Sequence, residues 1–261
     1  MNAVTKTMYI PLYGKAFVSR RGLFLRDPKA EEIWDSSAFP LSGKARSPWL
    51  AFYMGIRAAV FDSWLREKMA FWSDAAVLHI GCGLDSRVLR VGTEGHAWYD
   101  VDFADVIAER QRWYAPTAQY HMTAGDVRRS DWLAELPRSR RAIVVMEGVS
   151  MYLTAEELQN LLSALAARFD ELALLMDCYT PLAAKLSRWK NPVHDVGVGQ
   201  VYGVGDPNAP TNENLSFLRK HDMTPRHFID ELKGREKRIF QKLYAGSMSR
   251  KLYRLYEYGT R

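Results

Sequence analysis

Cysteine is scarce in this chain, which has 261 residues and two cysteines, Cys82 and Cys178. Two cysteines are too few for a framework of disulfides, and they exclude a zinc site with four cysteine ligands. We therefore expect no bound metal. A reducing cytoplasm is the simplest location to expect for the protein.

Long apolar runs are also absent. The most apolar stretch, residues 51–61, carries Arg57 in its middle, and no run approaches the roughly 18 uncharged residues that a membrane-spanning helix needs. Pro11, Gly14 and Lys15 interrupt any apolar segment near the start of the chain, so we expect no secretory signal peptide. The sequence thus predicts a protein without a membrane partner.

The composition is that of a globular protein, but its charge is unevenly spread. Hydrophobic residues make up 48% and charged residues 25%, which excludes disorder and a fibrous fold. Residues 1–70 carry a net charge of +5, residues 71–218 carry −6, and residues 219–261 carry +7. A solvated surface is the interpretation that we favour, and a positive field around a pocket for an anionic substrate is an alternative. Nucleic-acid binding is a third, but no motif of that kind is present, and we expect no nucleic-acid partner.

The order of predicted elements is helices first, then strands that alternate with helices. Residues 1–70 have interleaved aromatic side chains, and over residues 50–70 apolar residues recur at spacings of three and four, which predicts a helix. Short apolar runs predict strands over residues 76–80, 97–101, 119–123, 142–146, 172–176 and 252–258. Alternation of this kind is typical of βαβ units and a mostly parallel sheet, and so of an α/β fold.

Other segments complete the predicted organisation. Thr154 followed by Glu157 has the spacing of a capping box and predicts a helix that ends near residue 169. Residues 178–215 are rich in proline and glycine and predict a lid or insertion, and a helix is expected over residues 235–247. We expect a helical N-terminal cap over residues 1–70 and a main domain over residues 71–261, together forming one structural unit.

A glycine-rich loop follows the first predicted strand. Gly81 and Gly83 are separated by one residue, a spacing that lets the backbone turn sharply and approach a ligand closely. In an open α/β sheet, ligands bind outside the carboxyl ends of the strands, where this loop lies. The third glycine of a dinucleotide fingerprint is replaced by Ser86, which argues against a pyrophosphate ligand.

Acids follow the second to fifth predicted strands; they are Asp100, Asp102, Asp126, Glu147 and Asp177. Asp102 lies 19 residues beyond Gly83, the distance at which an acid binds a ribose diol. The alternative for Asp102 is an ordinary acid at a strand end, or a partner for Arg87. Carboxylates suit a cationic ligand that carries a nucleoside better than they suit a phosphate, and S-adenosylmethionine is such a ligand.

Several segments resemble the leucine carboxyl methyltransferase family, and within it the polyketide carboxyl O-methyltransferases of the tetracenomycin type. The sequence of residues 81–87, GCGLDSR, is similar to the family's G-x-G-L/M-D-T/S-R loop. Residues 22–30, 99–103 and 147–153 resemble further family segments in the same order. The resemblance implies a Rossmann-like class I methyltransferase with a seven-stranded, mostly parallel sheet, a helical N-terminal cap, a lid after strand five and S-adenosyl-L-methionine as cofactor.

The resemblance also assigns residues to the amino-acid end of the cofactor. Arg57 would pair with the methionine carboxylate, and Gly81 and Gly83 would contact the backbone portion of that methionine. Glu147 would lie near the same end.

Three residues are assigned by the resemblance to the nucleoside. Asp102 would hold the ribose hydroxyls, and Asp126 with the amide of Val127 would bind the adenine. The chain departs from the family where Ala104 replaces the usual proline after the acid.

The family resemblance favours a carboxylate of a small, polyketide-like natural product as the methyl acceptor. A carboxylate is already ionised at neutral pH and needs no general base, so we expect positioning rather than acid–base catalysis. Tyr152 and His194 are candidates on the acceptor side. The alternatives are a phenol or hydroxyl acceptor, a C-terminal carboxylate of a peptide, or a protein that binds S-adenosylmethionine without catalysis; the sequence does not indicate the oligomeric state.

Overall fold

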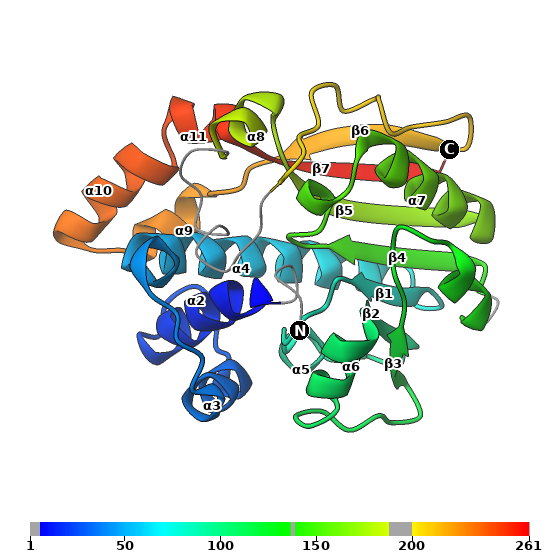
Figure 1. Cartoon of the computed structure of the whole chain (residues 1–261), viewed down its shortest axis with the longest axis horizontal. Coiled ribbons are helices and arrows are strands. Elements are labelled where there is room, and N and C mark those ends of the chain that lie inside the picture. Colours follow the sequence, from blue (N-terminus) through cyan, green and yellow to red (C-terminus); the bar gives the residue numbers. More distant parts are fainter. Residues whose placement is uncertain (1–5, 137–138, 188–199, 261) are drawn as a thin grey trace.

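A seven-stranded sheet forms the centre of the computed structural model, which describes residues 6–136, 139–187 and 200–260 (Figure 1). The strand order is β3-β2-β1-β4-β5-β7-β6, and neighbours are parallel except for β7, which is antiparallel to β5 and β6. The strands are β1 (Ala76–Ile80), β2 (Trp98–Asp102), β3 (Tyr120–Ala124), β4 (Arg141–Met146), β5 (Glu171–Tyr179), β6 (Leu215–His221) and β7 (Tyr253–Thr260). This confirms the predicted α/β fold with a mostly parallel sheet.

Side chains on both faces of the sheet are buried. On β4, Ile143 and Val145 pack in the same core as helix α4 (Pro48–Phe71). Val144 and Met146 point to the opposite face and pack in the core that contains helix α7 (Ala155–Arg168). Because both faces are covered, residues 142–146 of this strand form an unbroken apolar run, and that run is why the sequence predicts the strand.

Local sequence signals fix the start of helix α7. The Thr154 hydroxyl accepts a hydrogen bond from the Glu157 amide at 3.1 Å, and the Glu157 carboxylate accepts one from the Thr154 amide at 2.8 Å. The predicted capping box is therefore present, and it satisfies two amides that the first helical turn leaves without partners.

The other helices surround the sheet or extend from its ends (Figure 1). They are α2 (Tyr9–Arg20), α3 (Pro28–Ser37), α5 (Arg87–Val91), α6 (Ala104–Arg110), α8 (Pro181–Ser187), α9 (Arg226–Glu231), α10 (Gly234–Tyr244) and α11 (Ser247–Leu252). Short 3₁₀ turns are formed by residues Gly43–Arg46, Asp131–Glu135 and Ser150–Tyr152. Within the described ranges, no helix is long and apolar enough to cross a membrane.

Strand β6 is not among the strands predicted from the sequence. It lies at the edge of the sheet, so much of its surface faces solvent and its residues show no clear apolar pattern. Arg219 and His221 on β6 instead contact Glu257 on β7, at 2.7 and 2.6 Å, and Lys68 on α4 reaches the same carboxylate at 2.7 Å. Polar pairing therefore supports a strand that apolar periodicity could not reveal.

The segment after β4 also differs in detail from the prediction. Strand β5 continues to Tyr179, and helix α8 follows, so the first part of the predicted lid over residues 178–215 is regular structure. Residues 188–199 of the lid lie outside the described residues. The predicted helix over residues 235–247 is two helices, α10 and α11, because the chain turns at Gly246. The division into a cap and a main domain stays a prediction.

A buried ion network joins the N-terminal helices to the sheet domain. Asp62 on α4 accepts from Arg87 at 2.8 Å and from Arg90 at 2.7 Å, both on α5. Arg90 also contacts Asp27, which precedes α3, at 2.6 Å and Asp85 of the glycine-rich loop at 2.7 Å. Since each of these side chains is at most 7% exposed, every charge depends on its partners.

Candidate active site

A cavity of about 600 Å³ opens where the carboxyl ends of β1, β2 and β4 meet helices α2 and α4. Sites for small molecules usually measure about 300–1,000 Å³. Eight residues singled out from the sequence line the cavity: Arg57, Gly81, Gly83, Asp102, Asp126, Val127, Glu147 and Tyr152. His194, the remaining candidate, lies outside the described residues.

The glycine-rich loop needs glycine at two positions. Gly81 has φ +68° and Gly83 has φ +51°, a region that other residues rarely adopt. A β-carbon on Gly81 would lie 2.2 Å from Cγ2 of Val149, and one on Gly83 would lie 3.1 Å from Cβ of Met8. A side chain at either position would therefore crowd its neighbours, and glycine leaves the backbone of the loop exposed to the cavity.

Asp102 at the end of β2 is held by the same loop. Its carboxylate accepts hydrogen bonds from the amides of Gly83 and Phe103, both at 2.8 Å. Burial raises the pKa of Asp102 to about 6, although the two amide bonds oppose this shift. The carboxylate lines the cavity, where it can accept hydrogen bonds from a ligand hydroxyl.

Asp100 has a different role from Asp102. Asp100 lies within β2 and is fully buried. Its carboxylate accepts hydrogen bonds from the Tyr120 hydroxyl at 2.7 Å and from Arg110. His79 Nδ1 lies 3.1 Å from Asp100, and its Nε2 lies 2.9 Å from Arg87 Nη1. Because a guanidinium can only donate, Nε2 accepts and Nδ1 carries the proton. Burial and the charge of Arg87 lower the pKa of His79, which is therefore neutral.

The part of the cavity beside the ends of β2 and β3 is lined by Phe103, Asp126 and Val127. Both carboxylate oxygens of Asp126 contact Arg128, at 2.8 and 2.5 Å. These hydrogen bonds lower the pKa of Asp126, although burial opposes the shift. An adenine amino group bound here would share the carboxylate of Asp126 with Arg128.

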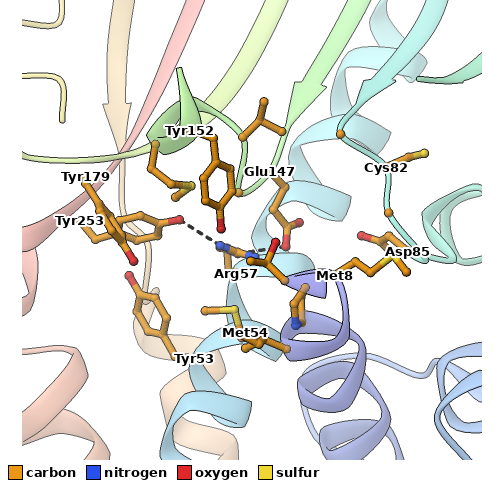
Figure 2. A pocket seen from close by; sticks show the side chains of 18 of the residues that line it. Met8, Tyr53, Met54, Arg57, Cys82, Asp85, Glu147, Tyr152, Tyr179 and Tyr253 are labelled. Atoms are coloured by element: carbon orange, nitrogen blue, oxygen red, sulfur yellow. Dashed lines mark hydrogen bonds and ion pairs between the residues drawn. The ribbon is translucent and has the colours of Figure 1, made fainter. Parts of the chain in front are cut away.

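Arg57 stands at the centre of a polar cluster (Figure 2). Its Nε donates to Glu147 at 3.0 Å, and its Nη1 donates to Asp177 at 3.0 Å and to the Tyr253 hydroxyl at 2.9 Å. A β-carbon on Gly148 would lie 3.5 Å from Nη2 of Arg57, so glycine at this position leaves the guanidinium uncovered. The contact of Arg57 with the carboxylate of the cofactor stays a prediction. The sequence did not predict that Glu147 and Asp177 would be partners of Arg57.

The pKa values of the two carboxylates beside Arg57 are shifted in opposite directions. Burial alone would raise the pKa of Glu147, but Arg57 and Arg87 outweigh it and lower this pKa to about 2. Burial raises the pKa of Asp177, which Arg57 opposes only in part. Asp177 also accepts from the Gly148 amide at 2.7 Å and from the Tyr253 hydroxyl. Arg57 is thus fixed in one orientation by groups from β5, β7 and the loop after β4.

Lys15 lines the cavity and was not among the residues predicted from the sequence. It lies on helix α2, is 2% exposed, and its ammonium is 3.1 Å from the carboxylate of Asp85. The signal that could have found it is a lysine within an apolar, aromatic helix, because a buried ammonium needs an anionic partner.

Tyrosines gather at the end of the cavity near β5 and β7, which β2, β1 and β4 separate from Asp126 after β3. Figure 2 shows Tyr53, Tyr179 and Tyr253 close to Arg57. The ring of Tyr253 lies 6.0 Å from that of Tyr53 and 5.1 Å from that of Tyr179. Tyr152, predicted on the acceptor side, also lines this end, and burial raises its pKa, so its hydroxyl stays neutral. Apart from Tyr152, these side chains come from segments that no motif connects.

The charges of the cavity are largely matched within the protein. The lysine and arginine side chains among the described lining residues are Lys15, Arg57 and Arg128, and each contacts a carboxylate. Four acids line the cavity, Asp85, Asp102, Asp126 and Glu147, so the lining acids outnumber the lining bases by one. No group of three or more potential metal ligands occurs in the part of the chain that the structure describes.

These features fit S-adenosylmethionine. The bare glycine backbone allows close approach, Asp102 offers a carboxylate to ribose hydroxyls, and the excess of acids suits a sulfonium cation. The cationic side chains of Lys15 and Arg57 line the cavity, where they could hold the carboxylate of the cofactor's methionine portion.

Two curated methyltransferases are similar to the chain in sequence. The tetracenomycin polyketide synthesis O-methyltransferase TcmP of Streptomyces glaucescens is 28% identical over 262 residues, which cover 99% of this chain and 97% of that protein. An S-adenosyl-L-methionine-dependent methyltransferase of Gibberella zeae, dpfgK, is 35% identical over 105 residues, or 37% of this chain and 35% of that protein.

Solved structures of methyltransferases have the same fold. An S-adenosylmethionine-dependent methyltransferase from Anabaena variabilis superposes with a TM-score of 0.54 at 9% identity and covers 79% of this chain and 85% of its own. Magnesium protoporphyrin IX methyltransferase from Synechocystis, with bound S-adenosylhomocysteine, gives a TM-score of 0.50 at 17% identity over 90% of this chain and 100% of its own.

A family model supplies the assignment. The model described as "Leucine carboxyl methyltransferase" matches residues 7–166, more than half of the chain. That range includes the glycine-rich loop, Asp102, Asp126 and Glu147. The chain therefore belongs to the leucine carboxyl methyltransferase family and is an S-adenosylmethionine-dependent methyltransferase.

Proposed function

We propose that the protein methylates a carboxylate oxygen of a small, largely apolar acid. The observation that carries the proposal is the lack of a free base at the tyrosine end of the cavity, within the described residues. Among the described residues that line the cavity, the histidine is His79, and its two nitrogens contact Asp100 and Arg87. A carboxylate acceptor needs no base, because its pKa of about 4 leaves it ionised at neutral pH.

We assign residues of one end of the cavity to the parts of the cofactor. The backbone of Gly81 and Gly83 lies against the amino-acid portion, and Asp102 accepts from the ribose hydroxyls. Asp126 and Val127 border the adenine. Arg57 and Glu147 fix the amino-acid end, with Arg57 kept in place by its protein partners.

The acceptor end is assigned to the tyrosines and the apolar side chains near them. Bound S-adenosylmethionine would supply a methyl group on a sulfonium. A carboxylate oxygen, which has no proton to lose, would attack that methyl carbon in line, so that the O–C bond forms as the C–S bond breaks and S-adenosylhomocysteine leaves. Tyr53, Tyr179 and Tyr253 border the space in which that oxygen must be held. The chain's contribution is to orient the acceptor and to exclude water, both of which are effects of proximity and environment.

The name of the Streptomyces relative, a polyketide synthesis O-methyltransferase, supports an acceptor of polyketide type. A phenol or hydroxyl acceptor and a peptide carboxylate are the competing acceptors. Each is an outcome of the experiment below.

The test is a panel of matched acceptors. Aromatic and aliphatic acids are incubated with the enzyme and S-adenosylmethionine beside analogues that carry a phenol or alcohol in place of the carboxyl, and a C-terminal peptide is included. We expect products that mild base cleaves, as it cleaves methyl esters but not methyl ethers. Products that resist base, or a loss of about 100-fold in kcat for His194→Ala, would instead indicate a hydroxyl acceptor. Methylation of the peptide but of none of the small acids would indicate a peptide carboxylate as acceptor. Binding of the cofactor with no transfer to any acceptor would indicate lost catalysis.

A further inference from the structure

Three helices around the mouth of the cavity carry an unusual share of exposed apolar side chains. Eight large apolar side chains are exposed in the described part of the chain, and five of them lie on α8, α10 and α11: Leu182, Leu186, Ile239, Leu243 and Met248. Their exposed fractions range from 39% to 63%. Scattered exposed apolar residues are ordinary, but a cluster marks a surface that binds something. We name these five residues the apolar collar.

The apolar collar is organised around the cavity. On α8, Leu182 and Leu186 are one helical turn apart, as are Ile239 and Leu243 on α10. Leu186, Leu243 and Met248 also line the cavity. Figure 1 shows the three helices together at one end of the molecule, with α8 beside α11. Whatever covers the collar therefore also meets the mouth of the active site.

Basic residues flank the apolar collar. Six exposed lysine and arginine residues lie on the same three helices: Lys185, Arg235, Arg238, Lys242, Arg250 and Lys251. Within the described residues of α8, α10 and α11, the one acid is Glu236. Its carboxylate accepts hydrogen bonds from Arg21 at 3.0 and 2.8 Å. The strongly basic end of the sequence is thus concentrated where apolar side chains are exposed.

We propose that the apolar collar and its basic flanks dock the protein on an anionic lipid surface, with the cavity mouth facing the lipid. A helix surface with aliphatic tips and lysine and arginine beside them is the pattern of proteins that lie in the membrane interface. The basic residues attract anionic head groups, and the aliphatic tips enter the apolar boundary. An apolar acceptor would then reach the cavity from the lipid. This contact lies on a membrane rather than across it, and it departs from the expectation that the chain has no membrane partner.

Two other occupants fit the surface less well. A second copy of the chain would bring six basic residues against six, so like charges would repel. The core of a protein–protein interface is enriched in aromatic residues, methionine and arginine, whereas four of the five collar residues are leucine or isoleucine.

The experiment is sedimentation of the full chain with lipid vesicles. One set contains phosphatidylcholine alone, and the other contains equal parts of phosphatidylcholine and phosphatidylglycerol. We expect binding to the anionic vesicles at least ~10-fold tighter than to the neutral ones, and weaker in high salt. Leu182→Gln/Ile239→Gln changes two collar residues that do not line the cavity, and it should weaken binding about 10-fold.

The matched control is Phe71→Gln/Leu89→Gln, which changes two apolar residues that are 79% and 60% exposed on other helices. It should bind like the unchanged protein. A second variant, Arg238→Glu/Lys242→Glu, tests the charges and should lose the preference for anionic vesicles. Binding of S-adenosylhomocysteine by each variant shows that it is folded.

Three results would overturn the proposal. The first is no binding of the unchanged protein to anionic vesicles. The second is equal binding by the collar variant and its matched control. The third is a dimer in sedimentation velocity that the collar variant alone loses, which would make the collar an interface between two copies.

Discussion

Asp102 offers a sharp test of the cofactor site, because its pKa of about 6 lies within the range in which enzymes are assayed. A ribose hydroxyl can donate to the carboxylate, and protonation removes that acceptor. With a pKa near 6, affinity for the cofactor should be almost constant above pH 7 and should fall by about 11-fold between pH 7.5 and pH 5. The sign is fixed: lower pH weakens binding, with a slope that approaches one decade per pH unit.

Asp102→Asn removes both the charge and the titration. Two hydrogen bonds to a charged acceptor contribute about 1.5–3 kcal/mol each, so at pH 7.5 we expect a loss in affinity of at least ~10-fold. The pH dependence should disappear in this variant, whereas that of other groups should remain. Calorimetry with S-adenosylhomocysteine between pH 5 and 7.5 measures both effects.

A complication is that Asp102 also holds the amides of Gly83 and Phe103. An analogue that lacks the ribose 2′-hydroxyl separates the two effects. The unchanged protein should bind it more weakly than S-adenosylhomocysteine, and Asp102→Asn should distinguish the two ligands much less. A flat affinity from pH 5 to 7.5 in the unchanged protein, or equal discrimination by both proteins, would refute the ribose contact.

Three further predictions concern stability and the loop. Arg57→Met leaves the buried carboxylate of Asp177 without a counter-charge, leaves Glu147 with Arg87 alone, and should lower the free energy of unfolding by about 3–5 kcal/mol in urea titrations; a loss below ~1 kcal/mol would contradict its structural role. Gly81→Ala should abolish binding of S-adenosylhomocysteine, since its β-carbon would meet Val149, whereas Gly22→Ala, at φ +62° in open space, should retain it. Hydrogen bonds from its basic partners outweigh burial and keep the pKa of Glu257 below its ordinary 4.5, so its contribution to stability is present above that pH and is lost as the pH falls further. Glu257→Gln should therefore be less stable at pH 7 and less sensitive to acid, and thermal unfolding at several pH values checks this.

The parts of the fold that the sequence predicts are those in which local pattern and burial agree. Strand β1 is apolar except for His79, and β4 is apolar after Arg141, because both of their faces are covered. Strand β6 escaped prediction because an edge strand satisfies its polar side chains through Glu257 on its neighbour, a contact that no local pattern contains.

The candidate site divides in the same way. The glycine-rich loop and Asp102 are predictable because backbone conformation and position after a strand are local properties. Lys15 and Tyr253 are not, because the fold brings them from opposite ends of the chain to one cavity. For Arg57, the family resemblance predicted a contact with the cofactor carboxylate, but its contact with Asp177 spans 120 residues and depends on the sheet.

The ion network of Asp27, Asp62, Asp85, Arg87 and Arg90 has a consequence for how this protein can change over evolutionary time. Its members come from the N-terminal helices, the glycine-rich loop and α5, and each is buried with its partners. Replacing one member leaves a buried charge without its partner. Selection should therefore remove a single substitution unless a second one compensates for it. Among relatives these positions should therefore vary together or not at all. A chimaera that joins the N-terminal helices of one relative to the sheet of another should fold only when both parents carry the same set.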